Sequence, residues 1–176
     1  TPCVAMANHQ GAFDIFMMYG LLPIPFRWVM KASLRKVPFM GKACQMAGFI
    51  FVDDQKKGSI KETMDSARRV LSEGTSIFIF PEGSRTLTGR MDRFKKGGFV
   101  LAYELDVPII PVSINGSYRA LRAGTRWVTP TRLTLTIHPP IHIDREGEYP
   151  RNMLQALDQV RSSIASVLPE EQETHS

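Results

Sequence analysis

A histidine and an aspartate lie five residues apart near the start of the chain, in the run Asn-His-Gln-Gly-Ala-Phe-Asp at residues 8–14. The imidazole of His9 can accept a proton near neutral pH. If Asp14 receives the other ring N–H, it fixes the tautomer and stabilises the imidazolium, which makes the pair a general base for a hydroxyl nucleophile. The alternative is a helix-capping histidine followed by an ordinary first-turn carboxylate, and this segment alone does not decide between the two.

A second run with chemical potential is Phe-Pro-Glu-Gly-Ser-Arg-Thr at residues 80–86. Proline before Glu82 and glycine after it predict a sharp, rigid turn. Arg85 offers a planar fork of donors that fits a phosphate group. More cations follow in the loop, at Arg90, Arg93, Lys95 and Lys96. Taken by itself, the segment fits a solvated surface turn better, with Arg85 paired to a carboxylate.

Three other patterns carry weaker signals. A nucleophile elbow at Ser84 would need glycine two residues away on each side, but Glu82 and Thr86 occupy those positions. Two prolines separate His138 from His142, so a helical metal pair is not expected there, and we predict surface imidazoles at a strand end. Two cysteines are too few for a thiolate zinc site.

Both chemical segments directly follow an apolar run that predicts a strand, at residues 3–7 and 76–80. Further strands are predicted at 26–30, 48–52, 109–114 and 133–137. Helices are predicted at 12–22, 34–46 with an interruption at Pro38, 59–73, 98–105 and 150–168. Ser59 and Glu62 have the spacing of a capping box, and Ile60 is expected on the buried face of that helix. The alternation predicts an α/β fold: a single-domain mixed, largely parallel sheet flanked by helices.

The chain has 176 residues, of which 43% are hydrophobic and 22% charged, and this predicts one packed domain at 1–168 with a polar tail at 169–176. Lys and Arg number 22 against 17 Asp and Glu, a net charge of +5. This excess favours a phosphate-bearing substrate, an acidic lipid surface or nucleic acid. No aromatic RNA-binding motif is interleaved with the basic residues, so we do not expect nucleic acid to be the partner.

No secretory signal and no membrane-spanning helix are expected from the sequence. The longest uncharged run near the start contains two prolines and is about half of the ~20 residues that a bilayer requires. The first residue is Thr1 rather than Met, which leaves open an upstream membrane-anchoring segment. Residues 15–28 are apolar and are expected mostly in the core, with bilayer docking or the lining of an acyl tunnel as the alternatives.

The two chemical segments together resemble the PlsC-type glycerolipid acyltransferase family, the 1-acylglycerol-3-phosphate acyltransferase-like enzymes. The pattern Asn-His-x4-Asp at residues 8–14 and Phe-Pro-Glu-Gly-Ser-Arg at 80–85 carries the resemblance. Residues 31–53 are similar to the family's second block and residues 107–112 to its fourth. Four blocks in order, within residues 3–117, are far more specific than any one of them.

The resemblance implies a glycerol-phosphate acyltransferase-like fold and an enzyme that moves a fatty acyl group from acyl-CoA or acyl carrier protein to the hydroxyl of 1-acyl-glycerol-3-phosphate, giving phosphatidic acid. His9 would be the base and Asp14 its orienting carboxylate. The substrate-binding residues would be Glu82, Gly83, Ser84 and Arg85. No metal and no bound cofactor are implied, because the thioester is a co-substrate. Membrane association at the cytoplasmic face is also implied.

One position departs from the family pattern. The second block usually ends in an acidic residue and an arginine assigned to the substrate phosphate, whereas this chain has Asp53 and Asp54. Lys56 or Lys57 would replace that arginine, or the acceptor headgroup differs. Two other function classes remain open at this stage: a lipid esterase using Ser84 with His9, and a non-catalytic phosphate-binding module.

Overall fold

The computed structural model describes residues 1–53, 58–121, 125 and 127–169. In these residues a six-stranded sheet has the order β3-β2-β4-β1-β5-β6. All neighbouring strands are parallel except β5 and β6, which are antiparallel. The predicted α/β class and largely parallel sheet are therefore confirmed. The strands are β1 Val4–Ala7, β2 Phe26–Lys31, β3 Ile50–Val52, β4 Ser76–Ile79, β5 Ile109–Asn115 and β6 Thr134–Ile137.

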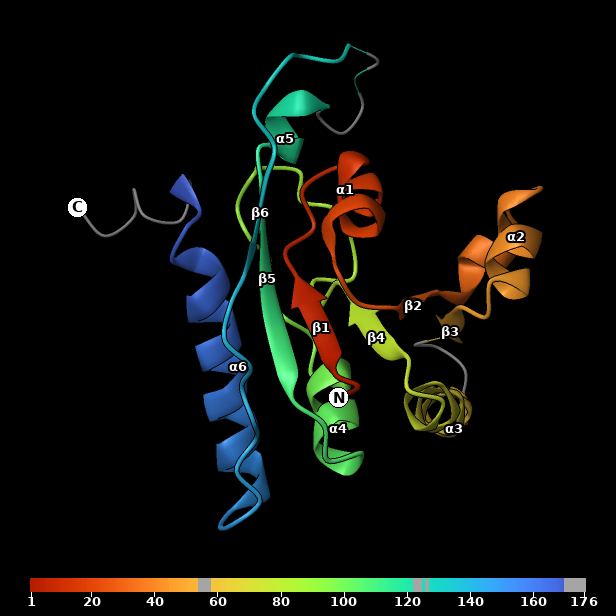
Figure 1. Cartoon of the computed structure of the whole chain (residues 1–176), viewed down its shortest axis with the longest axis vertical. Helices are drawn as coiled ribbons and strands as arrows, with labels where there is room; N and C mark the ends of the chain where they lie inside the picture. The colour runs from red at the N-terminus through yellow and green to blue at the C-terminus, as the bar shows by residue number, and fades with distance from the viewer. Residues whose placement is uncertain (54–57, 122–124, 126, 170–176) are drawn as a thin grey trace.

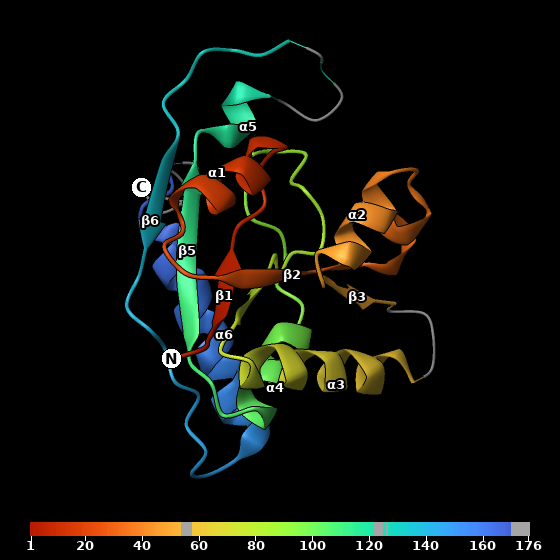
Figure 2. The same ribbon diagram turned by 45° about the vertical axis from the view of Figure 1, so that its right-hand side comes forward.

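Helices cover both faces of this sheet (Figures 1 and 2). They are α1 Phe13–Leu21, the 3-10 helix Ala32–Lys36, α2 Met40–Met46, α3 Ser59–Ser72, α4 Gly97–Glu104, α5 Ser117–Ala120 and α6 Tyr149–Ala165. Strand β1 is buried along its whole length, and alternate side chains enter different cores. Val4 and Met6 pack with α3, α4 and α6, while Ala5 and Ala7 pack with α1. This two-sided burial explains why β1 reads as an unbroken apolar run.

The start of α3 differs from the sequence prediction. Its N-cap is Gly58, at φ +90°, and Ser59 is already helical. The Ser59 hydroxyl accepts a hydrogen bond from the Asp53 N–H at 3.0 Å, so it joins the helix to the end of β3. The predicted capping box is therefore wrong. Ile60 is exposed rather than buried, because the buried face passes through Ser59, Thr63, Ala67 and Leu71.

Topology places the two chemical segments side by side. Strands β1 and β4 are parallel neighbours, with Val4 opposite Ile77 and Met6 opposite Ile79. From β1 the chain runs through α1 to β2, toward one edge of the sheet, and from β4 it runs through α4 to β5, toward the other edge. The helices of these two connections pack on opposite faces of the sheet, α1 against Ala5 and Ala7 and α4 against Val4 and Met6. The carboxyl ends of β1 and β4 therefore form a topological switch point, where such sheets usually hold a ligand in a crevice.

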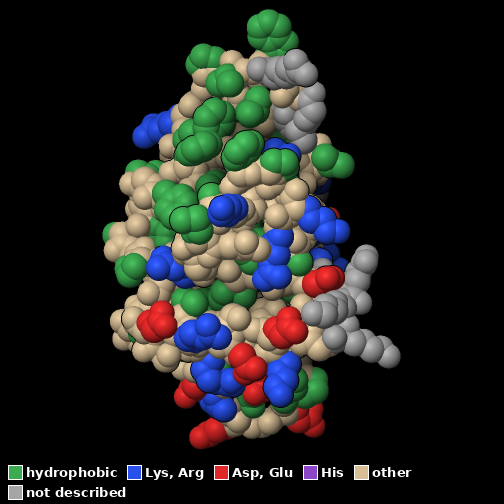
Figure 3. Space-filling model, turned by 90° about the vertical axis from the view of Figure 1, so that its right-hand side faces the viewer, with side chains coloured by type: hydrophobic (Ala, Val, Ile, Leu, Met, Phe, Trp, Pro, Cys, Tyr) green, Lys and Arg blue, Asp and Glu red, His purple; other side chains and the backbone are tan. Residues whose placement is uncertain are grey.

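One face of the molecule combines hydrophobic and basic side chains. Figure 3 shows hydrophobic side chains gathered in the upper half of the face, at the height of α1 and α2, with Lys and Arg side chains beside them and a mixture of Lys, Arg, Asp and Glu side chains in the lower half, at the height of α3. Phe16 on α1, Phe39 before α2 and Met46 at the end of α2 are 72%, 93% and 80% exposed. Within the described residues, no helix has the length and apolar character needed to cross a bilayer.

Candidate active site

His9 and Asp14 are in direct contact at the end of β1. His9 Nδ1 lies 2.7 Å from Asp14 Oδ2. The imidazole is also stacked on Phe80, with ring centroids 3.9 Å apart and planes 9° apart. With the Nδ1 proton directed at the carboxylate, Nε2 is the nitrogen that can accept a proton. Of the two interpretations that the five-residue spacing left open, the structure shows the His–Asp contact, and the geometry is that of an oriented general base.

The Asp14 carboxylate is fully buried and is held by several donors. Besides His9, Oδ2 accepts the N–H groups of Gln10 at 2.7 Å and Gly11 at 2.9 Å. The other oxygen, Oδ1, accepts a hydrogen bond from the Ser117 hydroxyl. These donors compensate the buried negative charge and fix the plane of the carboxylate, and thereby the imidazole that it contacts.

Two hydrogen bonds join the main chain of His9 to the segment that contains Glu82. The His9 N–H donates to Glu82 Oε1 at 2.7 Å, and the Thr86 N–H donates to the His9 carbonyl oxygen at 2.9 Å. The second Glu82 oxygen, Oε2, accepts the Asp92 N–H at 2.8 Å. The two predicted segments thus form one site. Both oxygens of Glu82 bind the protein itself, and its predicted contact with substrate stays a prediction.

The rest of the Glu82 turn faces outward beside His9. Gly83 has φ +77°, and a Cβ there would lie 3.0 Å from Lys95 Cε, so glycine suits both the backbone and the space. Ser84 and Arg85 are exposed. In the described part of the chain Arg85 has no hydrogen bond or ion pair, and none joins Ser84 to His9. The predicted contact of Arg85 with a substrate phosphate stays a prediction, and the hydrolytic pairing of Ser84 with His9 has no contact to support it.

Some predictions fall outside this geometry. Lys56 and Lys57 lie outside the described residues. No cluster of three or more His, Cys, Asp or Glu that could hold a metal ion occurs in the described ranges. The prediction of a surface imidazole at His138 is wrong, because this residue is half-buried. Its Nε2 lies 2.7 Å from Ser113 Oγ. Burial lowers the pKa of His138.

A large cavity of about 840 Å³ opens beside His9. Its walls are mainly apolar side chains from both sides of the crevice, including Trp28, Met30, Phe49, Met64, Ile79 and Val100. Besides His9, its charged lining residues are two cations, Lys31 and Lys95, and one carboxylate, Asp53. The volume falls within the roughly 300–1,000 Å³ usual for ligand sites. Ile15, Tyr19 and Trp28 all line it, in agreement with the alternative that part of residues 15–28 borders a ligand tunnel.

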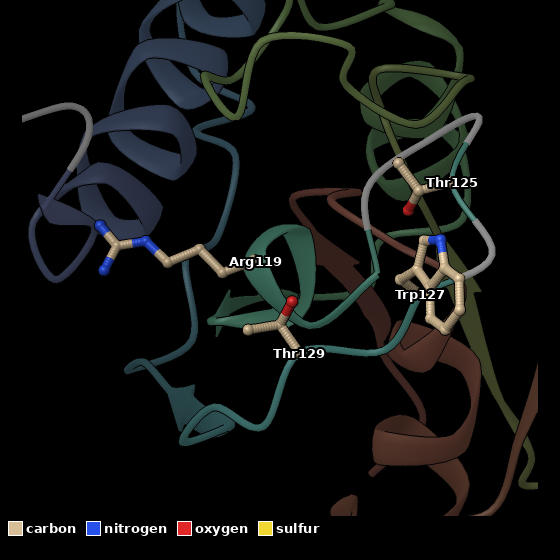
Figure 4. Close-up of a pocket in the computed structure, with 4 residues that line it drawn as sticks. All are labelled: Arg119, Thr125, Trp127 and Thr129. Carbon is tan, nitrogen blue, oxygen red and sulfur yellow. The ribbon is translucent and has the colours of Figure 1, made fainter.

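A second pocket, of about 360 Å³, lies near α5 (Figure 4). Arg119, Thr125, Trp127 and Thr129 line it, and Figure 4 shows the Arg119 side chain extending away from Trp127. Trp127 is 86% exposed. None of the predicted site residues borders this pocket, and its lining has no general base. The candidate general base therefore lies at the His9 cavity and not at this pocket.

A family model described as Acyltransferase matches residues 1–115, which include both chemical segments. The chain belongs to the acyltransferase family. It is 33% identical to 1-acyl-sn-glycerol-3-phosphate acyltransferase alpha of Mus musculus over 172 residues, 96% of this chain and 59% of the mouse protein. It is 30% identical to the 1-acyl-sn-glycerol-3-phosphate acyltransferase of Pseudomonas aeruginosa over 171 residues, 96% of this chain and 65% of that protein.

The fold is also that of a solved acyltransferase. The crystal structure of the 1-acyl-sn-glycerophosphate acyltransferase PlsC from Thermotoga maritima matches with a TM-score of 0.73 and 25% identity, over 94% of this chain and 66% of that one. The resemblance to the PlsC-type family is thereby confirmed. This chain spans about half to two thirds of the length of the curated relatives named in the comparisons.

Two residues around this candidate site carry no signal in the sequence. Ser117 bonds Asp14, and Arg161 on α6 donates to the carbonyl oxygens of Asp92 at 2.6 Å and Met91 at 3.2 Å. Arg161 thus holds the loop that Glu82 also binds. Each is a single polar residue on an element far along the chain, and no local motif marks it. The buried polar contacts become visible only once the strand order is known.

Glu82 should make the stability of this acyltransferase domain depend on pH. Burial raises the pKa of Glu82 from its ordinary 4.5 to about 7, although two main-chain donors oppose the shift. Between these values the folded protein retains a proton that the unfolded chain releases, so the free energy of unfolding falls as pH rises, by up to about 3 kcal/mol. Urea unfolding at pH 4.5 and 7.5 measures this fall.

Glu82→Gln does not titrate at this position and should flatten that pH dependence. Glu104→Gln, at an exposed carboxyl on α4, is the matched control and should keep the slope of the parent. Equal slopes for the parent and Glu82→Gln would contradict the assignment of the titration to Glu82.

Proposed function

We propose that this chain transfers a fatty acyl group from a thioester, acyl-CoA or acyl carrier protein, to the hydroxyl of 1-acyl-glycerol-3-phosphate, giving phosphatidic acid. The observation that carries the proposal is the His9–Asp14 pair at the wall of a large apolar cavity. A general base beside space for hydrocarbon is what acylation of a lipid hydroxyl requires. The names of the mouse and Pseudomonas relatives support the same acceptor.

The chemistry needs one proton acceptor and one good leaving group. A glycerol hydroxyl is a poor nucleophile at neutral pH, and a positioned base contributes about 10²–10⁴-fold. His9 Nε2 takes the hydroxyl proton as the oxygen forms a bond to the thioester carbonyl carbon. The carbon–sulfur bond then breaks and the thiolate leaves, taking a proton from the imidazolium or from solvent. Asp14 stabilises the imidazolium between these steps.

Charge around the cavity supports a phosphate-bearing acceptor. Arg85 extends from a turn that two hydrogen bonds fasten to His9. Lys31 and Lys95 border the cavity itself. In this proposal the acyl chain occupies the apolar part of the cavity, and the phosphate binds at its cationic margin with Arg85. Gly83 and Ser84 border the acceptor, and Lys56 or Lys57 remains the proposed replacement for the family arginine.

Thiol release from acyl-CoA tests the proposal directly. The chain should release CoA when 1-acyl-glycerol-3-phosphate is present, and phosphatidic acid should appear in equal amount by mass spectrometry. Release of free fatty acid without an acceptor would identify a thioesterase or esterase instead. Absence of any thiol release, with tight binding of the lysophospholipid, would favour the binding module. Replacing CoA by acyl carrier protein in the same assay identifies the donor.

The loss of kcat/KM on substituting Arg85 should depend on whether the acceptor carries a phosphate. A lysine cannot reproduce the two-pronged contact with phosphate. We expect Arg85→Lys to lower kcat/KM about 10- to 150-fold with the phosphate acceptor, the range for a charge-assisted hydrogen bond. With a neutral monoacylglycerol the loss should be less than about twofold. Arg151→Lys, at an exposed position on α6, is the control. Equal losses with both acceptors and a lowered melting temperature would assign Arg85 a structural role.

We further propose that the face carrying Phe16, Phe39 and Met46 docks on an anionic lipid surface at the cytoplasmic side of the membrane. Large apolar side chains this exposed are unfavourable in water and favourable in the headgroup region of a bilayer. The Lys and Arg side chains around them add attraction to acidic lipids (Figure 3). Met40 borders the cavity at α2, so a lipid substrate could enter from the docked surface.

Vesicle sedimentation tests this docking. Phe39→Ser combined with Met46→Ser should weaken binding to phosphatidylglycerol vesicles by about tenfold or more, because two exposed apolar groups are lost. Leu154→Ser combined with Val167→Ser, at exposed positions on α6 and just after it, should leave binding unchanged. A similar loss in both double variants would contradict docking through this face.

A further inference from the structure

Ser117 occupies a distinct place in the hydrogen bonds around Asp14. It is the first residue of α5, is fully buried, and donates its hydroxyl hydrogen bond to Asp14 Oδ1. Oδ2 carries the other contacts, from His9 and from the Gln10 and Gly11 N–H groups. Among the residues that the structure describes, Ser117 is the hydrogen-bond donor to Oδ1. The two carboxylate oxygens are thus held by different parts of the fold.

Two glycines bring Ser117 this close to the His9 segment. A Cβ on Gly11 would lie 2.8 Å from the Ser117 carbonyl oxygen, so any side chain there would push α5 away. Gly116 has φ +91°, and a Cβ on it would lie 2.2 Å from the Arg132 carbonyl oxygen. The backbone before Ser117 therefore turns in a way that other residues rarely adopt. Main-chain packing, rather than side-chain flexibility, sets the position of the hydroxyl.

We propose that Ser117 is a positioning residue for proton transfer, because it locks the Asp14 carboxylate in the orientation that keeps Oδ2 on His9 Nδ1. A carboxylate bound through one oxygen can still rock about its Cβ–Cγ bond, whereas donors at both oxygens fix its plane. His9 depends on that plane, since its ring is held between Asp14 and Phe80. This inference rests on the proposed acyl transfer, but Ser117 does not border the cavity and acts only through Asp14.

The first test separates chemistry from binding. Ser117→Ala should lower kcat about 10- to 100-fold, the effect of removing a hydrogen bond to a charged group. KM for the acyl-CoA and for the lysophospholipid should stay within about twofold of the parent. Ser113→Ala is the matched control, since Ser113 is an equally buried serine on β5 whose hydroxyl donates to the Ile164 carbonyl oxygen at 2.9 Å. It should reduce the melting temperature and retain kcat.

A double-mutant cycle supplies a readout that a merely structural role would not give. If Ser117 acts through Asp14, Ser117→Ala should cost less than about twofold in kcat when Asp14→Asn is already present. The same large factor in both backgrounds would overturn the proposal, as would a Ser117→Ala kcat within twofold of the parent. Ser117→Cys keeps the volume and a weaker donor, so its kcat should lie between those of the parent and Ser117→Ala.

The same measurements distinguish a failure of the role inferred for Ser117 from a failure of the proposed acyl transfer. Should Ser117→Ala fail to fold, Ser117→Cys carries the same comparison, and parent-like kcat in that variant would overturn the proposal. A parent protein that transfers no acyl group would defeat the proposed function itself. An active parent with an unaffected Ser117→Ala would defeat only the role of Ser117.

Discussion

His9→Ala is expected to lower kcat by about 10²–10⁴-fold, because it removes the group that accepts the hydroxyl proton. The imidazole does not hold the fold together: its ring contacts are the stacking on Phe80 and the bond to Asp14. The melting temperature should therefore change little compared with kcat. Thiol release with a saturating acceptor, measured beside a thermal melt, separates the two effects.

His142→Ala is the matched control for this variant, since His142 is an exposed imidazole far along the chain. It should retain the activity of the parent. A His9→Ala protein that kept turnover within a few-fold of the parent would remove His9 from the mechanism. A large loss with a collapsed melting curve would show instead that His9 is needed for folding.

Asp14→Asn is expected to lower kcat by roughly 10²–10⁴-fold, comparable to loss of the base itself. The amide has no net charge and cannot stabilise the imidazolium. Three donors converge on Oδ2, from His9, Gln10 and Gly11, so the asparagine oxygen is favoured there and its NH₂ would face the Ser117 hydroxyl. In that arrangement the fold survives and the charge alone is lost. Steady-state kinetics of thiol release should show the fall in kcat with little change in KM.

Comparing Asp14→Ala with Asp14→Asn separates the loss of the negative charge from the loss of the buried hydrogen-bond acceptor. It leaves the Gln10 and Gly11 N–H groups and the Ser117 hydroxyl without their buried acceptor, and an unsatisfied buried polar group costs about 1–3 kcal/mol. Its melting temperature should fall well below that of Asp14→Asn, while both variants lose activity. Parent-like turnover in Asp14→Asn would contradict a role for the charge of Asp14.

Strands that are buried along their whole length, and contacts between residues close in the sequence, could be predicted from the sequence. Strand β1 is buried on both faces, so its position follows from an apolar run. The His9–Asp14 contact joins residues five apart on one strand-to-helix turn; the spacing offered it as one of two interpretations, and the family resemblance favoured it. Pro38 likewise falls between the 3-10 helix Ala32–Lys36 and α2, as expected from the loss of an N–H group.

Contacts that depend on strand order could not be predicted. Glu82 accepts from His9 because β1 and β4 are neighbours, although 73 positions separate the two residues. Ser117 reaches Asp14 over 103 positions because β5 lies on the other side of β1. The capping box failed for a similar reason, since Ser59 binds the end of β3 instead of its own helix. The catalytic and substrate-binding roles of the site residues stay predictions.

The position of β1 has a consequence for how the protein folds during synthesis. This strand comes first in the sequence yet lies between β4 and β5, so Val4 waits for partners at Ile77 and Ile109. Pairing at such separations closes long loops and is slow compared with local helix formation. A nascent chain therefore carries β1 without a partner until residue 77 has been made, and with one open edge until residue 109 has been made, which leaves an apolar strand exposed as a target for chaperones.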